Sequence, residues 1–367
     1  MPEAALAESA PVPKPNHPTF SEGKKLALPS TVLAIAEDAV NRRLFCSCMD
    51  GGVYEVDLDS GKRVELYRHD NFASGVHWLA DRELLLSSGY DGRIIWFDYQ
   101  RKKIVRYVKA HDFWSWQSAV SPDKGIIASV TGRYQCGGYR YEPAPETEPS
   151  VKIYDTVTGD LMQSLPHVPP VESVAFSNDG KFVAAGNLMG EIRVWELASG
   201  EMLSTWTTPS FTGWGIIKGH YFTGGVFGLA FSPDNKELFL TGMGTTRDPA
   251  AGNGKQLWEA FSWQDENPRL TATNADKTGQ GLMETLRFHP SGEFFVMAGR
   301  LFNGNWNTAI YSSETRAELH TLKTNCRVTS SACSANGKML FLAGGNGQPR
   351  NKEAEGDFGV VRIYEVA

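Results

Sequence analysis

Histidine, serine and aspartate side chains suited to acid–base or nucleophilic chemistry recur along this sequence. His69, Ser87 and Asp91 are the three residue types of a hydrolase triad, in which serine attacks, histidine takes its proton and aspartate orients the histidine. Such a triad is recognised by geometry and not by sequence spacing. Two further histidines, His111 and His167, precede apolar segments as His69 does. The three histidines therefore occupy the same position of a repeated unit.

The spacing of these histidines indicates a structural role. His69 lies 28 residues before Phe97, and His167 lies 28 residues before Trp195. His111 lies 43 residues before Tyr154, or 27 once an insertion of 16 residues is set aside. An enzyme needs one active site and not several copies, so repetition favours a buried hydrogen-bonded strut, which stabilises only if every polar member has a partner. We therefore predict no catalytic residues.

The remaining candidates for a functional site are Asp and Glu side chains in the longer loops, which could bind a metal ion. Because such residues are usually solvated, we expect no metal at this group, which comprises Asp248, Glu259, Glu353, Glu355 and Asp357. The sequence has no His-Glu-x-x-His, no Walker loop and no Gly-x-Ser-x-Gly. Glycine pairs in the loops resemble phosphate-binding turns, but no helix is expected to follow them, so the helix terminus that binds phosphate is missing. No cofactor is predicted.

The elements that must position these side chains are repeated β-strands. The clearest copy is residues 171–200, where an apolar strand, a Ser-Asn-Asp-Gly turn, a second strand and an alternating third strand follow one another. A two-residue closing pair ends each unit, at 56–57, 97–98, 154–155, 195–196, 261–262, 311–312 and 364–365. Two intervals are 41 residues, and we interpret the longer ones as insertions. A period of about 40–45 residues with four strands is typical of a propeller blade.

The turns, closing pairs and histidines resemble those of the WD40-repeat family over residues 23–367. The resemblance implies an all-β fold, a single seven-bladed β-propeller with four antiparallel strands in each blade. In that family the histidine joins a serine, an aspartate and the closing tryptophan in a buried tetrad. His69, Ser87 and Asp91 match three positions, but Phe97 replaces the tryptophan. We therefore expect this tetrad to be incomplete.

The two ends of the chain are expected to meet in the last blade. The sequence stops three residues after Tyr364, so the seventh blade lacks an outer strand, and residues 23–28 have the form of one. We predict that this N-terminal segment completes the last blade, since ring closure leaves only short, protected sheet edges. Residues 1–20, rich in Pro, Ala and Glu, are expected to be a disordered lead-in to the propeller at 21–367.

The extra length is expected on one face, called the top face below, where each inner strand begins and each second strand ends. The insertions lie at residues 132–150, 207–225, 242–255, 299–307 and 344–359. Aromatic and Arg side chains dominate interface hot spots, and long loops on a rigid scaffold commonly carry function. The residues predicted to bind a partner are Trp114, Trp116, Tyr134, Tyr139, Arg140, Tyr141, Trp214, His220, Tyr221, Arg247, Arg300, Trp306 and Arg350.

Charge and composition exclude several classes of protein. There are 36 Lys and Arg against 42 Asp and Glu, a net charge of −6, so the basic excess of a nucleic-acid-binding protein is missing. No apolar run reaches the roughly 18 residues of a membrane helix, and the N-terminus has no secretory signal. The five cysteines are odd in number and form no Cys-x-x-Cys. We expect buried free thiols and a reducing, cytoplasmic location.

These observations predict a non-catalytic scaffold that binds a protein or peptide partner through the top face. No nucleic acid, membrane, cofactor or metal is expected, and the chain is expected to be a monomer unless it belongs to a complex. The step from the resemblance to this function is an analogy from fold. The alternative is a propeller hydrolase of the lactonase type, with its site in the channel mouth. Three or more converging Asp, Glu, Asn or His side chains there would favour the enzyme.

Overall fold

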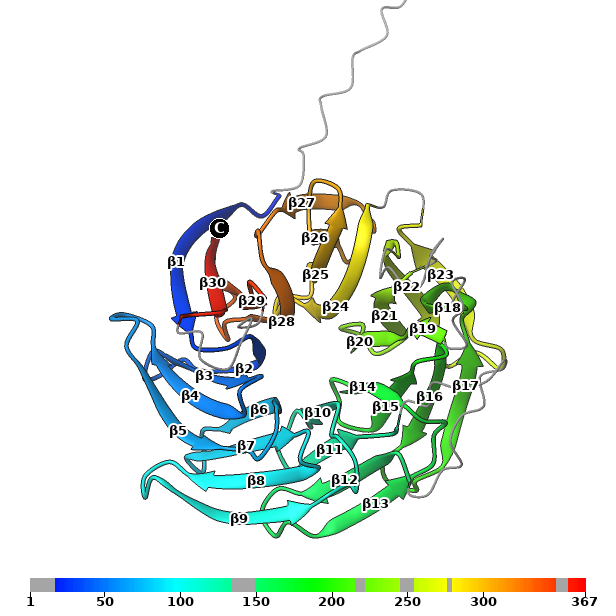
Figure 1. The fold of residues 1–367 in the computed structure, drawn as a ribbon. Helices are drawn as coiled ribbons and strands as arrows, with labels where there is room; N and C mark the ends of the chain where they lie inside the picture. The colour runs from blue at the N-terminus through cyan, green and yellow to red at the C-terminus, as the bar shows by residue number, and fades with distance from the viewer. Residues whose placement is uncertain (1–16, 134–148, 215–221, 245–253, 276–278, 348–355) are drawn as a thin grey trace, which may run out of the picture.

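Alternation of apolar and polar residues builds the strands of this protein. In β16 (Glu191–Glu196), Ile192 and Val194 are buried, whereas Glu191 and Arg193 are half-buried. The computed structural model describes residues 17–133, 149–214, 222–244, 254–275, 279–347 and 356–367. Over these ranges, seven four-stranded antiparallel sheets form a ring (Figure 1). The predicted all-β, seven-bladed propeller is confirmed.

The strands of each blade follow one another from the axis of the ring outward. Blades one to three consist of β2 (Val32–Asp38), β3 (Arg43–Cys48), β4 (Gly52–Asp57), β5 (Arg63–Arg68); β6 (Ala73–Leu79), β7 (Leu84–Gly89), β8 (Arg93–Asp98), β9 (Lys103–Lys109); and β10 (Gln117–Val120), β11 (Ile126–Val130), β12 (Val151–Asp155), β13 (Leu161–Leu165). Blades four to six consist of β14 (Val171–Phe176), β15 (Phe182–Asn187), β16, β17 (Met202–Thr207); β20 (Val226–Phe231), β21 (Glu237–Met243), β22 (Gln256–Ser262), β23 (Arg269–Thr273); and β24 (Gln280–Phe288), β25 (Phe294–Asn303), β26 (Thr308–Ser312), β27 (Glu318–Leu322). Between blades four and five lie a 3₁₀ turn, η1 (Pro209–Phe211), and the hairpin β18 (Thr212–Trp214) and β19 (Phe222–Gly224).

The seventh blade joins the two ends of the chain. Its strands are β28 (Arg327–Cys333), β29 (Met339–Gly345), β30 (Gly359–Val366) and, outermost, β1 (Phe20–Leu28). β1 runs antiparallel to β30, with Leu26 opposite Val361, and the two strands lie side by side in Figure 1. The predicted closure by an N-terminal strand is confirmed. The strand begins at Phe20, three residues earlier than predicted, and residues 1–16 of the expected lead-in lie outside the described residues.

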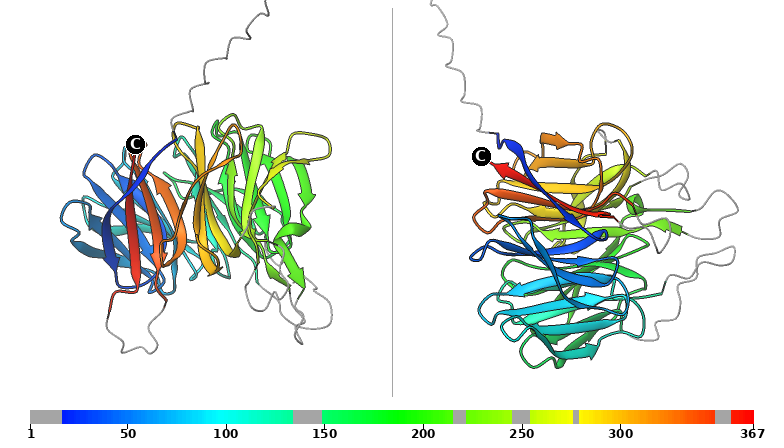
Figure 2. Two further views of the ribbon diagram at one scale, coloured as in Figure 1. Left: turned by 90° about the horizontal axis from the view of Figure 1, so that it is seen from above. Right: turned by 60° about the vertical axis from the view of Figure 1, so that its left-hand side comes forward.

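The hydrophobic core lies between neighbouring blades. Phe45 and Val53 of the first blade pack with Val76, Trp78 and Leu85 of the second. Figure 2 shows the ring from the side, with the strands running from one face to the other. Burying one large apolar side chain contributes about 1.5–3 kcal/mol. Each blade is therefore stabilised mainly by the blades beside it, and the ring must close to bury every sheet face.

His69 is a structural strut, but the member that completes its network was not expected. Nδ1 of His69 lies 3.0 Å from the Asp91 carboxylate, and its Nε2 lies 2.8 Å from Oγ of Ser87. The hydroxyl of Tyr67 donates to Ser87 Oγ at 2.9 Å, and the Tyr67 ring stacks on Phe97 with centroids 4.7 Å apart. The predicted incompleteness is wrong for this blade, because Tyr67 supplies the donor that was sought at position 97.

The other two repeated histidines are also buried. His111 Nε2 lies 2.9 Å from Ser129 Oγ, and His167 Nε2 donates to the carbonyl of Ala185 at 3.2 Å. His167 also contacts Trp195, with ring centroids 6.0 Å apart. These contacts place both histidines inside blades three and four, as the structural interpretation of the repeat requires.

Replacing Tyr67 with Phe should cost about 1 kcal/mol of unfolding free energy, because Ser87 loses a buried hydrogen bond while the ring stack on Phe97 stays. Urea denaturation of the full chain would measure the change. Tyr107→Phe is the matched control, since Tyr107 is 63% exposed on β9. Equal stability of wild type and Tyr67→Phe would show that the tetrad is incomplete after all.

Cys46 and Cys48 lie on β3 in one core cluster between the first and seventh blades, and both are buried free thiols. Burial raises the pKa of the Cys46 thiol to about 12. Cys326 and Cys333 are only half-buried, and Cys136 lies outside the described residues. The expectation of buried thiols is confirmed for the pair on β3 and is too strong for Cys326 and Cys333.

Candidate functional site

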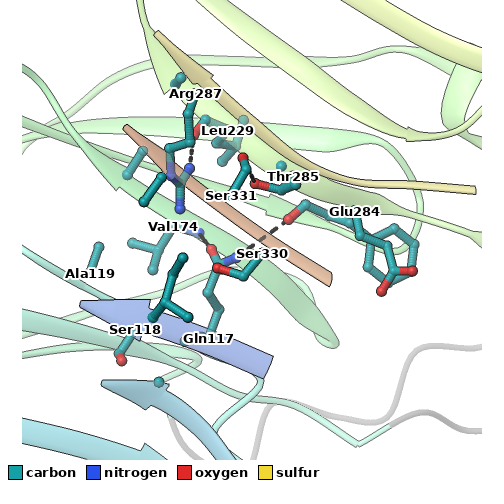
Figure 3. Close-up of a pocket in the computed structure, with 18 of the residues that line it drawn as sticks. Gln117, Ser118, Ala119, Val174, Leu229, Glu284, Thr285, Arg287, Ser330 and Ser331 are labelled. Atoms are coloured by element: carbon teal, nitrogen blue, oxygen red, sulfur yellow. Dashed lines mark hydrogen bonds between the residues drawn. The ribbon is translucent and has the colours of Figure 1, made fainter. Parts of the chain in front are cut away.

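A cavity of about 680 Å³ follows the axis of the ring, and the innermost strand of each blade lines it. Figure 3 shows Gln117, Glu284 and Ser330 around it, from blades three, six and seven. A cavity of a few hundred cubic ångströms that gathers polar groups from several elements is the usual form of a binding site. Its opening on the top face is called the channel mouth below.

The inner strands share a β-bulge at the channel mouth. In six of the seven, the pairing with the second strand skips one residue near the start of the inner strand. A bulge re-aims the side chain of the extra residue. The extra residues are Leu33, Ser74, Glu172, Phe227, Glu284 and Thr329, and all of them line the cavity. In six of the seven blades, the fold therefore presents one variable side chain at the opening.

The carboxylate of Glu284, one of these bulge residues, forms an ion pair with Arg327. Nε of Arg327 donates to its Oε1 at 2.6 Å and Nη2 donates to its Oε2 at 2.8 Å. The Glu284 side chain is only 9% exposed, whereas that of Arg327 is 44% exposed. Two parallel hydrogen bonds make this a bidentate pair, which fixes both side chains. Arg327 thus keeps part of its guanidinium available at the channel mouth.

Glu172 provides a second carboxyl that has no such partner. Its Oε2 is buried, and no hydrogen bond or ion pair is made by Glu172 within the described residues. The atom packs against Gly225, where a Cβ would come within 1.9 Å of it and where φ is +120°, so only glycine fits. Burial raises the pKa of Glu172 well above its usual value, which favours the neutral acid.

An aromatic cluster lies beside these carboxyls. Tyr90 and Trp114 stack with centroids 4.7 Å apart and an interplanar angle of 9°, and Phe113 stacks on Trp114 at 4.8 Å. Trp116 meets the edges of Tyr90 and Trp114, and its Nε1 donates to the carbonyl of Gly132 at 2.9 Å. All four rings are half-buried, and Tyr90 and Trp116 line the cavity. We call Tyr90, Phe113, Trp114 and Trp116 the aromatic cluster.

Gln117 ties three blades together below the mouth. Its Oε1 accepts a hydrogen bond from the backbone N–H of Val174 at 2.9 Å, and its Nε2 donates to the carbonyl of Phe227 at 3.4 Å (Figure 3). The side chain therefore bridges β10, β14 and β20. Such contacts hold the rim of the cavity in place before any partner arrives.

A second variable position lies three residues further along each inner strand. Register places His77 and Arg287 level with alanine in the other five blades, namely Ala36, Ala119, Ala175, Ala230 and Ala332. Nε2 of His77 lies 2.9 Å from Ser118 Oγ, and Ser118 also bonds Ser88 at 2.8 Å. The pKa of His77 is lowered to about 4, first by burial and then by the positive charge of Arg287. These two side chains therefore share the interior of the channel.

The structure brings Trp114 and Trp116 together but separates two other predicted binding residues from them. Trp306 packs against the core between blades five and six, and its carbonyl accepts from Nε2 of Gln256 at 2.6 Å. Arg300 is exposed on an extension of β25, where the predicted loop at 299–307 is in part a strand paired with β24. The prediction of an insertion loop there was wrong for residues 299–303, because the hairpin continues beyond the blade.

Most of the remaining predicted binding residues lie outside the described residues. Trp214 is the last residue of β18. Outside the described residues lie Tyr134, Tyr139, Arg140, Tyr141, His220, Tyr221, Arg247 and Arg350. The strands that flank the longest insertion, β11 ending at Val130 and β12 beginning at Val151, meet the top face as expected.

Sequence reasoning missed the charged residues of the channel, namely Glu172, Glu284, Arg287 and Arg327, and also Tyr90 and His77. A signal for two of them was available, because aligning the inner strands on their Ser-Pro-Asp-like turns puts His77 and Arg287 at a position that is otherwise alanine. No group of three or more His, Cys, Asp or Glu side chains in the described ranges is arranged to hold a metal ion. No helix in these ranges is long and apolar enough to cross a membrane.

Comparison with known proteins agrees with the repeat. The WD domain, G-beta repeat family matches residues 159–196, which include β14, β15 and β16. The chain is a WD40-repeat propeller. Among proteins similar to this WD40 propeller, telomerase protein component 1 of Mus musculus is 24% identical over 288 residues. That alignment covers 77% of this chain but only 9% of the relative.

Two other relatives of the WD40 propeller differ in name and size. Guanine nucleotide-binding protein subunit beta of Oryza sativa subsp. japonica is 21% identical over 294 residues, covering 77% of this chain and 68% of the relative. Apoptotic protease-activating factor 1 of Rattus norvegicus is 26% identical over 230 residues, covering 62% of this chain and 17% of the relative. This chain thus spans most of the plant relative but only a small part of the other two.

Proposed function

We propose that this WD40 propeller is a non-catalytic scaffold that binds a protein or peptide segment at the channel mouth. The observation that carries the proposal is the half-buried aromatic cluster, stacked at 4.7 Å and 4.8 Å, beside the exposed part of Arg327. Aromatic and arginine side chains are the residues most often found at energetic hot spots of interfaces. The cluster is rigid, so a partner would lose little of its binding energy to ordering it.

The names of similar proteins agree with such a role. Guanine nucleotide-binding protein subunit beta of Oryza sativa and eukaryotic translation initiation factor 3 subunit I of Dictyostelium discoideum are both named as subunits of larger assemblies. The latter is 24% identical over 181 residues. By analogy we propose that this chain also works within an assembly. The side chains of the bulge residues at the channel mouth would then select its partner.

Trp114→Ala should reduce partner capture by at least about tenfold, because truncating an interface hot spot costs 2 kcal/mol or more. Affinity purification of the full chain from source cells, quantified by mass spectrometry, would measure the loss. The indole makes no hydrogen bond within the described residues and is half-buried, so the melting temperature should change little.

Tyr107→Ala is the matched control for this experiment, since Tyr107 is an exposed aromatic residue on the outer strand β9. It should capture the same proteins as wild type. If both variants capture them equally, the partner binds elsewhere and the proposed site is wrong. A drop in melting temperature together with unchanged capture would make the aromatic cluster a packing element.

A further inference from the structure

Arg287 is a cationic side chain that the propeller does not need for its fold. Five of the seven blades have alanine at the same position of the inner strand, and their strands pair in the same register as β24 and β25. The space on the channel axis therefore does not require a large side chain here. A residue that departs from the repeat without structural need is a candidate for function.

The guanidinium of Arg287 has no acidic partner among the residues that the structure describes. Its Nη1 donates to the carbonyl of Leu286 at 3.0 Å. At 3.4 Å it also donates to the carbonyl of Leu229 in the neighbouring blade (Figure 3). No ion pair of Arg287 occurs within the described residues, and the residue is exposed to the cavity that it lines. Guanidinium carries five N–H donors in a planar fork, and the two carbonyls share one nitrogen. The other nitrogens remain free for a ligand.

An unpaired charge inside a protein is costly. A cation among low-dielectric walls loses solvation, and proteins normally offset the loss with a counter-ion or a ligand. The surrounding walls lower the pKa of Arg287 by desolvation, and the cost is only partial because the side chain stays exposed to the cavity. Arginine nevertheless stays charged in proteins, so the channel holds a permanent positive charge.

Hydroxyl and imidazole groups lie around the same stretch of the channel. Thr285 and Ser331, which line the cavity, bond each other at 2.8 Å. His77, level with Arg287 in the second blade, bonds Ser118. These groups can donate hydrogen bonds to oxygen atoms. A planar fork beside hydroxyl donors matches the geometry of carboxylate and phosphate oxygens.

We propose that Arg287 is the centre of an anion-binding site inside the channel, and that the site takes a small molecule bearing a carboxylate or a phosphate. The cavity of about 680 Å³ suits a ligand of that size. The site lies inside a closed ring of seven inner strands that line the cavity, so it suits a small ligand better than a long polymer. Tyr90 and Trp116 of the aromatic cluster line the same cavity, but the anion site is centred on Arg287 and is tested independently of the scaffold function.

Isothermal titration calorimetry of the full chain with inorganic phosphate and with sodium acetate would test the site. We expect saturable binding of at least one probe, with a dissociation constant of about 1 mM or tighter, and the stronger probe identifies the chemistry of the natural ligand. Arg287→Ala should weaken that binding at least about tenfold. Arg287→Lys, which keeps the charge and loses the fork, should give an intermediate affinity.

Arg101→Ala is the matched control, because its side chain is 70% exposed beside Asp98 on the outer part of the second blade. It removes the same charge from the protein and should bind the probe as wild type does. Arg287→Ala should also melt at or above the wild-type temperature in probe-free buffer, since alanine is what the other blades carry. Equal binding by Arg287→Ala, no saturable binding of either probe to wild type, or a lower melting temperature for Arg287→Ala would each overturn the proposal.

Discussion

Deletion of residues 1–28 is expected to lower the melting temperature by about 10 °C or more. The deletion removes β1, the outer strand of the seventh blade, and so leaves the N–H and C=O groups of β30 that face β1 without partners. It also removes Leu26 and Leu28, which are 3% and 0% exposed and pack with Val361 and Cys46. Differential scanning calorimetry of the truncated and full chains would measure the difference.

A point substitution separates the packing of β1 from its strand pairing. Leu28→Ala should cost about 2–5 kcal/mol of unfolding free energy, the usual range for a buried leucine, because its side chain is fully buried. Lys25→Ala, on the exposed side of the same strand, should change stability little. If the truncated protein melts with the full chain, or if both point variants are equally stable, β1 does not close the ring.

The fold was predictable because each blade repeats the same turns and the same pattern of apolar residues. The turn at Ser177 and the closing pair Trp195-Glu196 recur along the chain, and each marks a strand end in the structure. Ring closure followed from one missing strand and one spare segment. The early part of the sixth blade was predicted less well, because the extension of β24 and β25 has no counterpart in the other repeats.

The site was much less predictable, because it exists only after the ring closes. Glu172 and Glu284 are more than a hundred residues apart in sequence and meet only through seven inner strands around one axis. Their exposure at the mouth depends on a bulge, a register shift that no turn or periodicity announces. Tyr67 was missed for a related reason, since the donor to Ser87 comes from an outer strand and not from the closing pair.

Acid should destabilise this protein over the pH range in which the histidines of an unfolded chain take up protons. Burial lowers the pKa of His111 and of His167 to about 3 and that of His77 to about 4, whereas a histidine in an unfolded chain titrates near 6.5. Between those values the unfolded state binds more protons than the folded state. These three histidines therefore make the unfolding free energy rise with pH across this window, and they outnumber Glu172, whose raised pKa contributes the opposite slope.

Each of the three histidines should contribute up to about 1.4 kcal/mol per pH unit below about pH 6, so the loss over two units is several kcal/mol. Urea denaturation of the full chain at intervals between about pH 7.5 and about pH 4.5 would give the slope. His77→Ala, which installs the residue carried by five other blades, should reduce that slope by the equivalent of one proton. Lys25→Ala removes no group that titrates in the window and should leave the slope unchanged. A flat profile down to about pH 5 would mean that these histidines are not held neutral by burial.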